Sequence, residues 1–227
     1  MHETDIPPQD RVAVWDLATR AFHWLLVALL GFSWVSGELG GSWLKWHFWS
    51  GYTILTLVVF RIFWGFIGSS TARFASFIRG PAAAFAHLRH VLNREPDREI
   101  GHNPLGGWMI VVMLLCLLLQ AGTGLFANDD IMIEGPLAAK VSSATSAWLT
   151  TVHKLNFRVI VVLGGLHILA VIAYLLVARQ NLIGPMLTGS KKREPGMLPP
   201  ARLVGFGRAL IALAVAALIV YGIVNLG

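Results

Sequence analysis

Residues 150–178 read TTVHKLNFRVIVVLGGLHILAVIAYLLVA, and this apolar stretch carries two histidines, His153 and His167. About 20 apolar residues are enough for a helix to cross the hydrocarbon core of a bilayer. A histidine inside such a helix is costly and normally has a partner. The fourteen-residue separation is almost four helical turns, so both imidazoles lie on one face, about 21 Å apart. Other membrane helices must therefore supply what these two side chains bind.

Four more apolar stretches accompany this one, and the composition is that of a membrane protein. Of the 227 residues, 56% are hydrophobic and 13% are charged, whereas about 25% of a soluble domain is charged. We predict five transmembrane helices, over residues 21–37, 47–68, 104–127, 149–178 and 205–225. The polar, acidic N-terminal residues do not fit a signal peptide, so we expect the first helix to stay in the mature protein.

Basic residues gather in two of the connecting segments, which predicts the orientation of the chain. They are Arg73, Arg79, Arg89, Arg94 and Arg98 between the second and third spans, and Arg179, Lys191, Lys192, Arg193 and Arg202 between the fourth and fifth. The positive-inside rule then places the N-terminus in the cytoplasm and the C-terminus outside. The net charge of +6 is thus explained by topology and contact with membrane lipid, and we expect no nucleic-acid binding.

The connecting segments carry few other signals. The stretch AAAFAHLRHVL, residues 82–92, suits a short helix along the cytoplasmic interface, and Asn103 can cap the third span. Residues 128–148 look irregular, and residues 189–202 look like a polar linker. We therefore divide the chain into a membrane domain, residues 1–187, and an addition, residues 188–227, that holds the linker and the fifth helix.

The single cysteine, Cys116, excludes an intrachain disulfide, and the absence of a C-x-x-C-H motif excludes covalent c-type haem attachment. The sequence holds eight histidines, which topology sorts into groups. His2 lies in the N-terminal tail, and His87 and His90 lie in the interfacial segment, so we expect all three to be solvated. His102 directly precedes the helix cap, where we expect a local polar role.

The other four histidines lie in or at the ends of apolar spans and match in depth two by two. His47 begins the second span and His153 lies near the start of the fourth, both toward the outside; we call them the outer pair. His23 begins the first span and His167 lies deep in the fourth, both toward the cytoplasm; we call them the inner pair. Any exchange of partners would have to bridge most of the membrane.

Each pair offers two neutral imidazoles from facing helices, the arrangement that holds the iron of a b-type haem. We predict two non-covalent haem b groups in an all-α four-helix transmembrane bundle, with a fifth helix added at the C-terminal end. A flat macrocycle needs close backbone approach, which glycine permits. Gly51 follows His47 by one turn. Gly164 and Gly165 stand just before His167.

Haem propionates require cations near the membrane surfaces, and four basic residues are placed for this role. They are Arg20 and Arg61 near the inner pair, and Lys154 and Arg158 beside the outer pair. A buried arginine without an anion is costly, so Arg61 and Arg158 are the main candidates for a propionate or a quinone head group. For a quinone, His102 and Lys154 are further candidates.

Other interpretations of these residues compete with haem. A membrane histidine can simply hydrogen-bond a neighbouring helix. A zinc or copper site also uses imidazole, but neither pair has Cys, Asp or Glu at matching depth. A histidine-based metal or proton transporter is disfavoured because the spans lack carboxylates and an inverted repeat. We interpret Gly122 and Gly124 as helix-packing residues. The tryptophans near span ends, taken as interfacial anchors, are Trp15, Trp24, Trp46 and Trp148.

Several stretches together resemble the bacterial cytochrome b561 family, which includes the b-type cytochrome subunits of nickel-iron hydrogenases. They are VWDLATRAFHWLLV, WHFWSGYTILTLVVFRIFWGFIGS, GHNPLGGWM, and H-K-L-N-F-R followed by H-I in the fourth span, most of residues 11–187. In that family the first, second and fourth helices ligate the haems, which the resemblance carries onto His23, His47, His153 and His167. The fifth span departs from the family's four-helix pattern.

The resemblance implies an electron carrier of the bacterial inner membrane and its respiratory chain. Such a protein exchanges electrons between quinone or quinol and a periplasmic redox partner, such as a c-type cytochrome. A role as the membrane anchor of a nickel-iron hydrogenase is the alternative. Quinone oxidoreductase activity and a homodimer are left open by the sequence.

Overall fold

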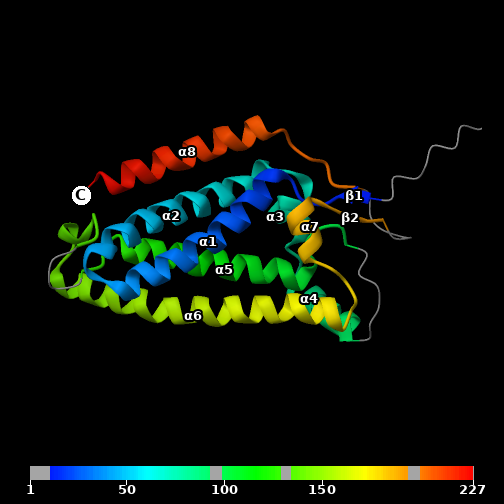
Figure 1. Ribbon diagram of the computed structural model, residues 1–227, viewed down its shortest axis with the longest axis horizontal. Coiled ribbons are helices and arrows are strands. Elements are labelled where there is room, and N and C mark those ends of the chain that lie inside the picture. The colour runs from blue at the N-terminus through cyan, green and yellow to red at the C-terminus, as the bar shows by residue number, and fades with distance from the viewer. Residues whose placement is uncertain (1–10, 93–98, 129–133, 194–199, 227) are drawn as a thin grey trace, which may run out of the picture.

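A computed structural model describes residues 11–92, 99–128, 134–193 and 200–226. Within these ranges five helices are long and apolar enough to cross a membrane (Figure 1). They are α1 Leu17–Leu39, α2 Leu44–Ile67, α5 Pro104–Gly124, α6 Ser143–Leu176 and α8 Phe206–Val224. The all-α membrane fold and the five predicted spans are thereby confirmed.

Polar caps explain where three of these helices begin. Asn103 caps α5 as predicted, its side chain accepting from the backbone N–H of Gly106. The first span was predicted to begin at residue 21, but Asp16 accepts from the backbone N–H of Thr19 and starts α1 at Leu17. Residues 128–148 are likewise not all irregular, because the Ser142 cap starts α6 at Ser143. Side-chain acceptors of this kind satisfy N–H groups that a helix start leaves unpaired.

Short elements join the long helices. They are β1 Arg11–Ala13, η1 Gly41–Trp43, η2 Ser70–Ala72, α3 Phe74–Phe77, α4 Pro81–Leu92, η3 Ala138–Lys140, α7 Ile183–Thr188 and β2 Ser190–Lys192. Helix α4 confirms the short helix predicted over residues 82–92. The segment predicted as a polar linker includes β2, which pairs antiparallel with β1 and sets Arg11 opposite Lys192. Figure 1 shows both strands at the same end of the bundle as α3, α4 and α7, with the C-terminus at the other end.

Helix α2 is the centre of the packing. It packs against α1, α5 and α8, while α6 packs mainly on α5. Between α2 and α5 the core is apolar, with Val58 and Leu117 both buried. On the α8 side, alanines meet the rings of Phe60 and Trp64; they are Ala209, Ala212 and Ala216. The fifth helix therefore lies directly on the bundle.

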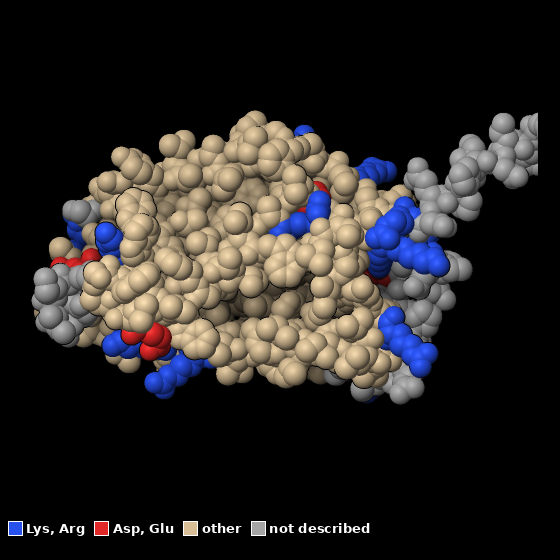
Figure 2. Space-filling model, viewed as in Figure 1, with Lys and Arg blue, Asp and Glu red and all other residues tan. Residues whose placement is uncertain are grey.

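The surface agrees with a membrane location. On the face drawn in Figure 2, lysines and arginines lie mostly toward the two ends, and a broad uncharged belt separates them. Trp24, Trp46 and Trp148 are exposed, as expected of anchors. Trp15 is not, since only 8% of it is exposed and it packs with Val14 and Ile100. The prediction that Trp15 is an interfacial anchor was wrong, because Ile100, Met186 and the ring of His102 pack against it.

Candidate functional site

The structure brings the four membrane histidines together in the two predicted combinations. In the outer pair the ring centroids of His47 on α2 and His153 on α6 lie 6.1 Å apart, with an interplanar angle of 77°. In the inner pair the centroids of His23 on α1 and His167 on α6 lie 6.4 Å apart, at 55°. All four side chains are partly buried. Helix α6 thus contributes one imidazole to each pair, and a different helix supplies each partner.

These spacings fit a metal held between two imidazoles. Two nitrogens that each bind a first-row metal at about 2 Å, from opposite sides, put their ring centroids about 6 Å apart. Among the residues that the structure describes, no group of three or more His, Cys, Asp or Glu side chains could hold a metal ion by itself. The donor set of each site is therefore two imidazoles, which is the axial set of a bis-histidine haem.

Both imidazoles of the outer pair are fixed by backbone carbonyl groups. Nδ1 of His47 lies 2.8 Å from the carbonyl oxygen of Ser33 on α1. Nδ1 of His153 lies 2.8 Å from the carbonyl oxygen of Gln120 on α5. Both contacts are hydrogen bonds in which the imidazole N–H donates. This arrangement orients each ring so that Nε2, the other nitrogen, is left for a metal.

Two glycines make these close contacts feasible. A Cβ on Gly37 would lie 2.9 Å from the His47 ring, and a Cβ on Gly124 would lie 3.0 Å from the His153 ring. Gly124 on α5 therefore lets the His153 ring of α6 approach closely, which agrees with its predicted role in helix packing, whereas a Cβ on Gly122 would meet no atom within 4 Å. Sequence reasoning missed Gly37 and Ser33 altogether, because every residue carries a carbonyl group and the residue type does not show which one accepts.

The Gln120 side chain occupies the position beside His153 where a metal would bind. The amide nitrogen of Gln120 lies 3.0 Å from Nε2 of His153. Its amide oxygen accepts a hydrogen bond from Asn156, which also donates to the carbonyl of Cys116. A metal at Nε2 requires the Gln120 side chain to turn aside, at the cost of a neutral hydrogen bond worth about 1 kcal/mol. That cost is small beside the energy of a metal–nitrogen bond.

The predicted glycines beside the pairs have the space that a macrocycle needs. A Cβ on Gly51, Gly164 or Gly165 would meet no atom within 4 Å. Gly51 is one turn from His47, and Gly164 is almost one turn from His167 on the same side of α6. The backbone is therefore open next to both pairs, as a flat ligand against the helices requires.

Arg61 is the most deeply buried of the four predicted cations. Only 2% of it is exposed, and its guanidinium carbon lies 5.3 Å from the centre of the Phe74 ring. One guanidinium nitrogen, Nη1, is buried and has no hydrogen-bond partner among the described residues. A buried cation with an unused donor is costly unless an anion meets it. Arg61 is thus placed to bind an anionic group inside the bundle.

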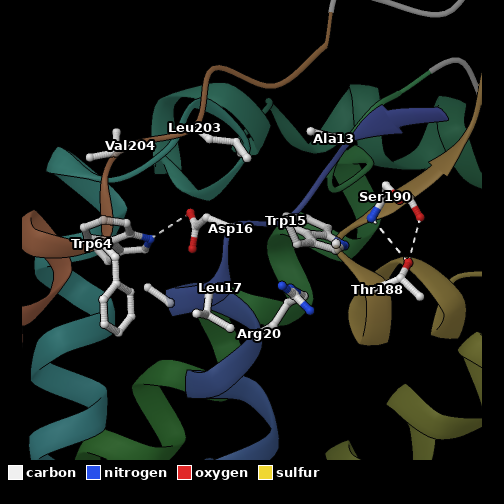
Figure 3. A pocket seen from close by; sticks show the side chains of 13 residues that line it. Ala13, Trp15, Asp16, Leu17, Arg20, Trp64, Thr188, Ser190, Leu203 and Val204 are labelled. Atoms are coloured by element: carbon white, nitrogen blue, oxygen red, sulfur yellow. Dashed lines mark hydrogen bonds between the residues drawn. The ribbon is translucent and has the colours of Figure 1, made fainter. Parts of the chain in front are cut away.

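Arg20 lies in a cavity of about 320 Å³ between the start of α1, the end of α2 and the segments around α7 and α8 (Figure 3). Its Nη1 donates to the carbonyl of Leu187 over 2.6 Å, while its Nε is buried without a partner. In the same cavity Trp64 donates through Nε1 to Asp16, the cap of α1. Arg20 therefore keeps one free donor near His23, the residue one turn along α1.

The two predicted cations beside the outer pair are exposed. Lys154 directly follows His153, and its charge acts on that imidazole. Arg158 is nine residues from His167, which is two and a half turns, so it lies on the opposite side of α6 from that histidine. Of the four cations, only Arg61 and Arg20 combine burial of a donor atom with a position near the inner pair.

Of the four remaining histidines, the structure describes the side chains of His87 and His102. His87 is half-buried and shares a hydrogen bond of 2.9 Å with the hydroxyl of Tyr174 on α6, so the expectation of a solvated residue was wrong. His2 and the side chain of His90 lie outside the described residues. His102 packs between Trp15 and Phe77, at centroid distances of 4.4 and 4.9 Å. Burial, and then the charge of Arg61, lower its pKa to about 3, so His102 is neutral at physiological pH.

A model of the family described as prokaryotic cytochrome b561 matches residues 14–189. The chain belongs to the prokaryotic cytochrome b561 family. The match covers all four paired histidines, which lie between residues 23 and 167. It ends before α8, so the fifth helix lies outside the matched part.

The curated relatives are described as b-type cytochromes as well. A probable Ni/Fe-hydrogenase B-type cytochrome subunit of Rhizobium leguminosarum bv. viciae is 27% identical over 215 residues, covering 79% of this chain and 88% of the relative. The protein of the same name from Azotobacter chroococcum mcd 1 is 25% identical over 212 residues, covering 80% and 88%. The one from Rhodobacter capsulatus is 26% identical over 165 residues, covering 64% and 61%. No solved structure matches the chain with comparable significance.

Membership of this family, together with the five apolar helices, makes the chain a multi-pass membrane cytochrome of b type. Its activity is electron transfer through haem b, in a membrane and with a redox partner.

Proposed function

We propose that the chain binds two b haems, one at each histidine pair, and moves electrons across the bacterial inner membrane between quinone or quinol and a periplasmic redox partner. The observation that carries this proposal is the pair of centroid distances, 6.1 Å for the outer pair and 6.4 Å for the inner pair. Both fit two imidazoles that would hold one metal, and the same helix, α6, supports both sites.

Each residue would contribute binding or orientation. His47 and His153 would hold the outer iron, and His23 and His167 the inner one. When bound, haem b supplies a metal that gains and loses one electron at a potential set by its surroundings. Gly51 and Gly164 leave the backbone open beside the rings. Arg61 and Arg20, with their unused donors, would bind propionates or a quinone head group at the inner site; His102 and Lys154 remain candidates for quinone contact.

The orientation and the division of the chain also belong to the proposal. We place the end with β1 and β2 in the cytoplasm, because its connecting segments carry most of the basic residues. The outer pair then faces the periplasm, as does the C-terminus. All four paired histidines precede residue 187, so residues 1–187 would be the haem-binding domain and residues 188–227 an addition to it.

The relatives favour a second candidate for the partner. All three named above are probable Ni/Fe-hydrogenase B-type cytochrome subunits. This chain would then be the anchor of such a hydrogenase and would pass its electrons to quinone. Isolation in mild detergent separates the two partners: retained hydrogenase subunits support the anchor, whereas a retained c-type cytochrome supports the first proposal.

Haem content tests the core of the proposal. We expect two reducible b haems per purified chain, and one in each of the variants His167→Ala and His153→Ala. His87→Ala is the matched control, because this histidine belongs to neither pair, and it should keep both haems. A protein without reducible haem bands would exclude the proposal, and a variant of either paired histidine that keeps both haems would exclude the pairing.

A further inference from the structure

We infer that the outer site is the low-potential site and the inner site the high-potential site, because within the described residues the imidazoles of the outer pair donate hydrogen bonds to helix carbonyl groups and those of the inner pair do not. Electrons would therefore run downhill from the periplasmic end to the cytoplasmic end. This inference rests on the proposed function, since it assigns an order to the two haems that the proposal places at the pairs.

The carbonyl contacts of the outer pair come from the same local arrangement, used twice. In SWVSG, residues 33–37, the carbonyl of Ser33 accepts from His47, and Gly37 leaves room for the ring. In QAGTG, residues 120–124, the carbonyl of Gln120 accepts from His153, and Gly124 leaves the room. An acceptor at position i and a glycine at i+4 lie one turn apart on the same helix face.

A hydroxyl completes both arrangements at position i+3. Ser36 donates to the carbonyl of Ser33 over 3.1 Å. Thr123 donates to the carbonyl of Gln120, also over 3.1 Å. Both hydroxyl residues are buried, at 1% and 5% exposure. Each hydroxyl also donates to the carbonyl one residue earlier, that of Phe32 over 2.8 Å and that of Leu119 over 2.7 Å. The acceptor carbonyls lie on α1 and α5, two helices that supply no ligand to the outer site.

The inner pair has no such arrangement. Nδ1 of His23 is buried without a hydrogen-bond partner. Within the described residues the ring of His167 forms no hydrogen bond, so neither inner imidazole donates to a carbonyl as His47 and His153 do. The two sites therefore have the same ligands but different surroundings.

Hydrogen bonding at Nδ1 changes what the imidazole gives to the metal. A ring whose N–H donates to a carbonyl becomes more basic and donates more strongly through its other nitrogen. Stronger donation favours the more positive, oxidised iron and lowers the reduction potential. The outer pair has two such bonds and the inner pair none. The buried charge of Arg61 at the inner end acts in the same direction, because a nearby cation favours the reduced iron.

A redox titration of the purified holoprotein, followed by its absorption spectrum, tests this order. The variant His167→Ala keeps only the outer haem, and His153→Ala keeps only the inner haem, so each potential can be assigned. We expect the outer haem to be the harder one to reduce. Equal potentials, or a higher potential at the outer haem, would overturn the inference.

Two glycine variants test the cause. Gly37→Ala and Gly124→Ala each push a ring away from its carbonyl, so the reduced-to-oxidised ratio of the outer haem at a fixed potential should rise, by about tenfold at most, or about 59 mV for a one-electron couple. Gly31→Ala and Gly122→Ala are the controls on the same helices, where a Cβ meets no atom within 4 Å. Shifts no larger than those of the controls would refute the role of the carbonyl groups. Failure to bind two haems at all would instead refute the proposed function.

Discussion

The side-chain amide of Asn103 donates a hydrogen bond to the hydroxyl of Tyr174 over 2.7 Å. Asn103 caps α5 and Tyr174 lies near the end of α6, so the bond closes the bundle at the end that holds the inner pair. The same hydroxyl meets Nε2 of His87 on α4. A single phenol thus joins three helices.

Tyr174→Phe should therefore destabilise this end of the bundle. The variant leaves the buried amide of Asn103 without its acceptor, which costs about 1–3 kcal/mol. Thermal unfolding in detergent measures the loss, and Tyr221→Phe, at an exposed position of α8, is the control. Equal stability of the two variants would mean that the Tyr174 hydroxyl is not needed.

Arg61→Gln should weaken haem binding at the inner site only. Removal of a charge-assisted hydrogen bond costs about 1.5–3 kcal/mol, or roughly 10- to 100-fold in affinity. The variant should not destabilise the haem-free protein, because the substitution removes a buried guanidinium whose Nη1 has no hydrogen-bond partner among the described residues. Haem titration of the variant measures both sites. Arg158→Gln, an exposed change on α6, is the control, and unchanged inner-site affinity in Arg61→Gln would exclude a role for Arg61 with the propionates.

Ala216→Leu should weaken the packing of α8 against α2. Ala216 is fully buried between α8 and α2, so the larger side chain overpacks this contact and costs about 1–3 kcal/mol. Ala217→Leu places the same side chain on the exposed face of α8 and should be nearly neutral. Protease cleavage in the segment before α8 reports the difference, and both variants should keep the haem content of the original chain.

His102 should make stability depend on pH. Its pKa is lowered to about 3 in the folded chain, so between pH 6.5 and about 3 the unfolded chain binds a proton that the folded chain does not. Stability therefore falls as the pH is lowered from 6.5 toward 3. Thermal unfolding at several pH values measures the slope. His102→Gln, neutral throughout, should reduce it, whereas an unchanged slope would mean that His102 does not contribute.

The histidine pairs could be predicted because they depend only on helix rise and direction. His153 and His167 share a face of one helix, and their depth selects His47 and His23 as partners. The starts of α1 and α6, which precede the predicted ones, could also have been predicted, since Asp16 and Ser142 are good capping residues. The sequence therefore holds enough information for the fold class and for the placement of the pairs.

What could not be predicted depends on contacts between distant segments. The carbonyl of Gln120 accepts from a histidine 33 residues away. Every residue has a backbone carbonyl, so the amino-acid sequence does not show which one accepts. Trp15 has the sequence position of an anchor, and its burial depends on Ile100 and Met186, which are distant in the chain. The two strands have three residues each, too short for an alternating pattern to appear.

The pairing of β1 with β2 has a consequence for biosynthesis. Arg11 bonds to Ser190, which lies 179 residues later in the chain. The ribosome must therefore make all of α1, α2, α5 and α6 before the first strand finds its partner. Until then, the start of α1 can be held by segments made earlier than β2, through the bonds from Trp64 to Asp16 and from Thr71 to the Val14 carbonyl. The pairing of β1 with β2, next to the start of α1, is thus among the last contacts that the growing chain can form.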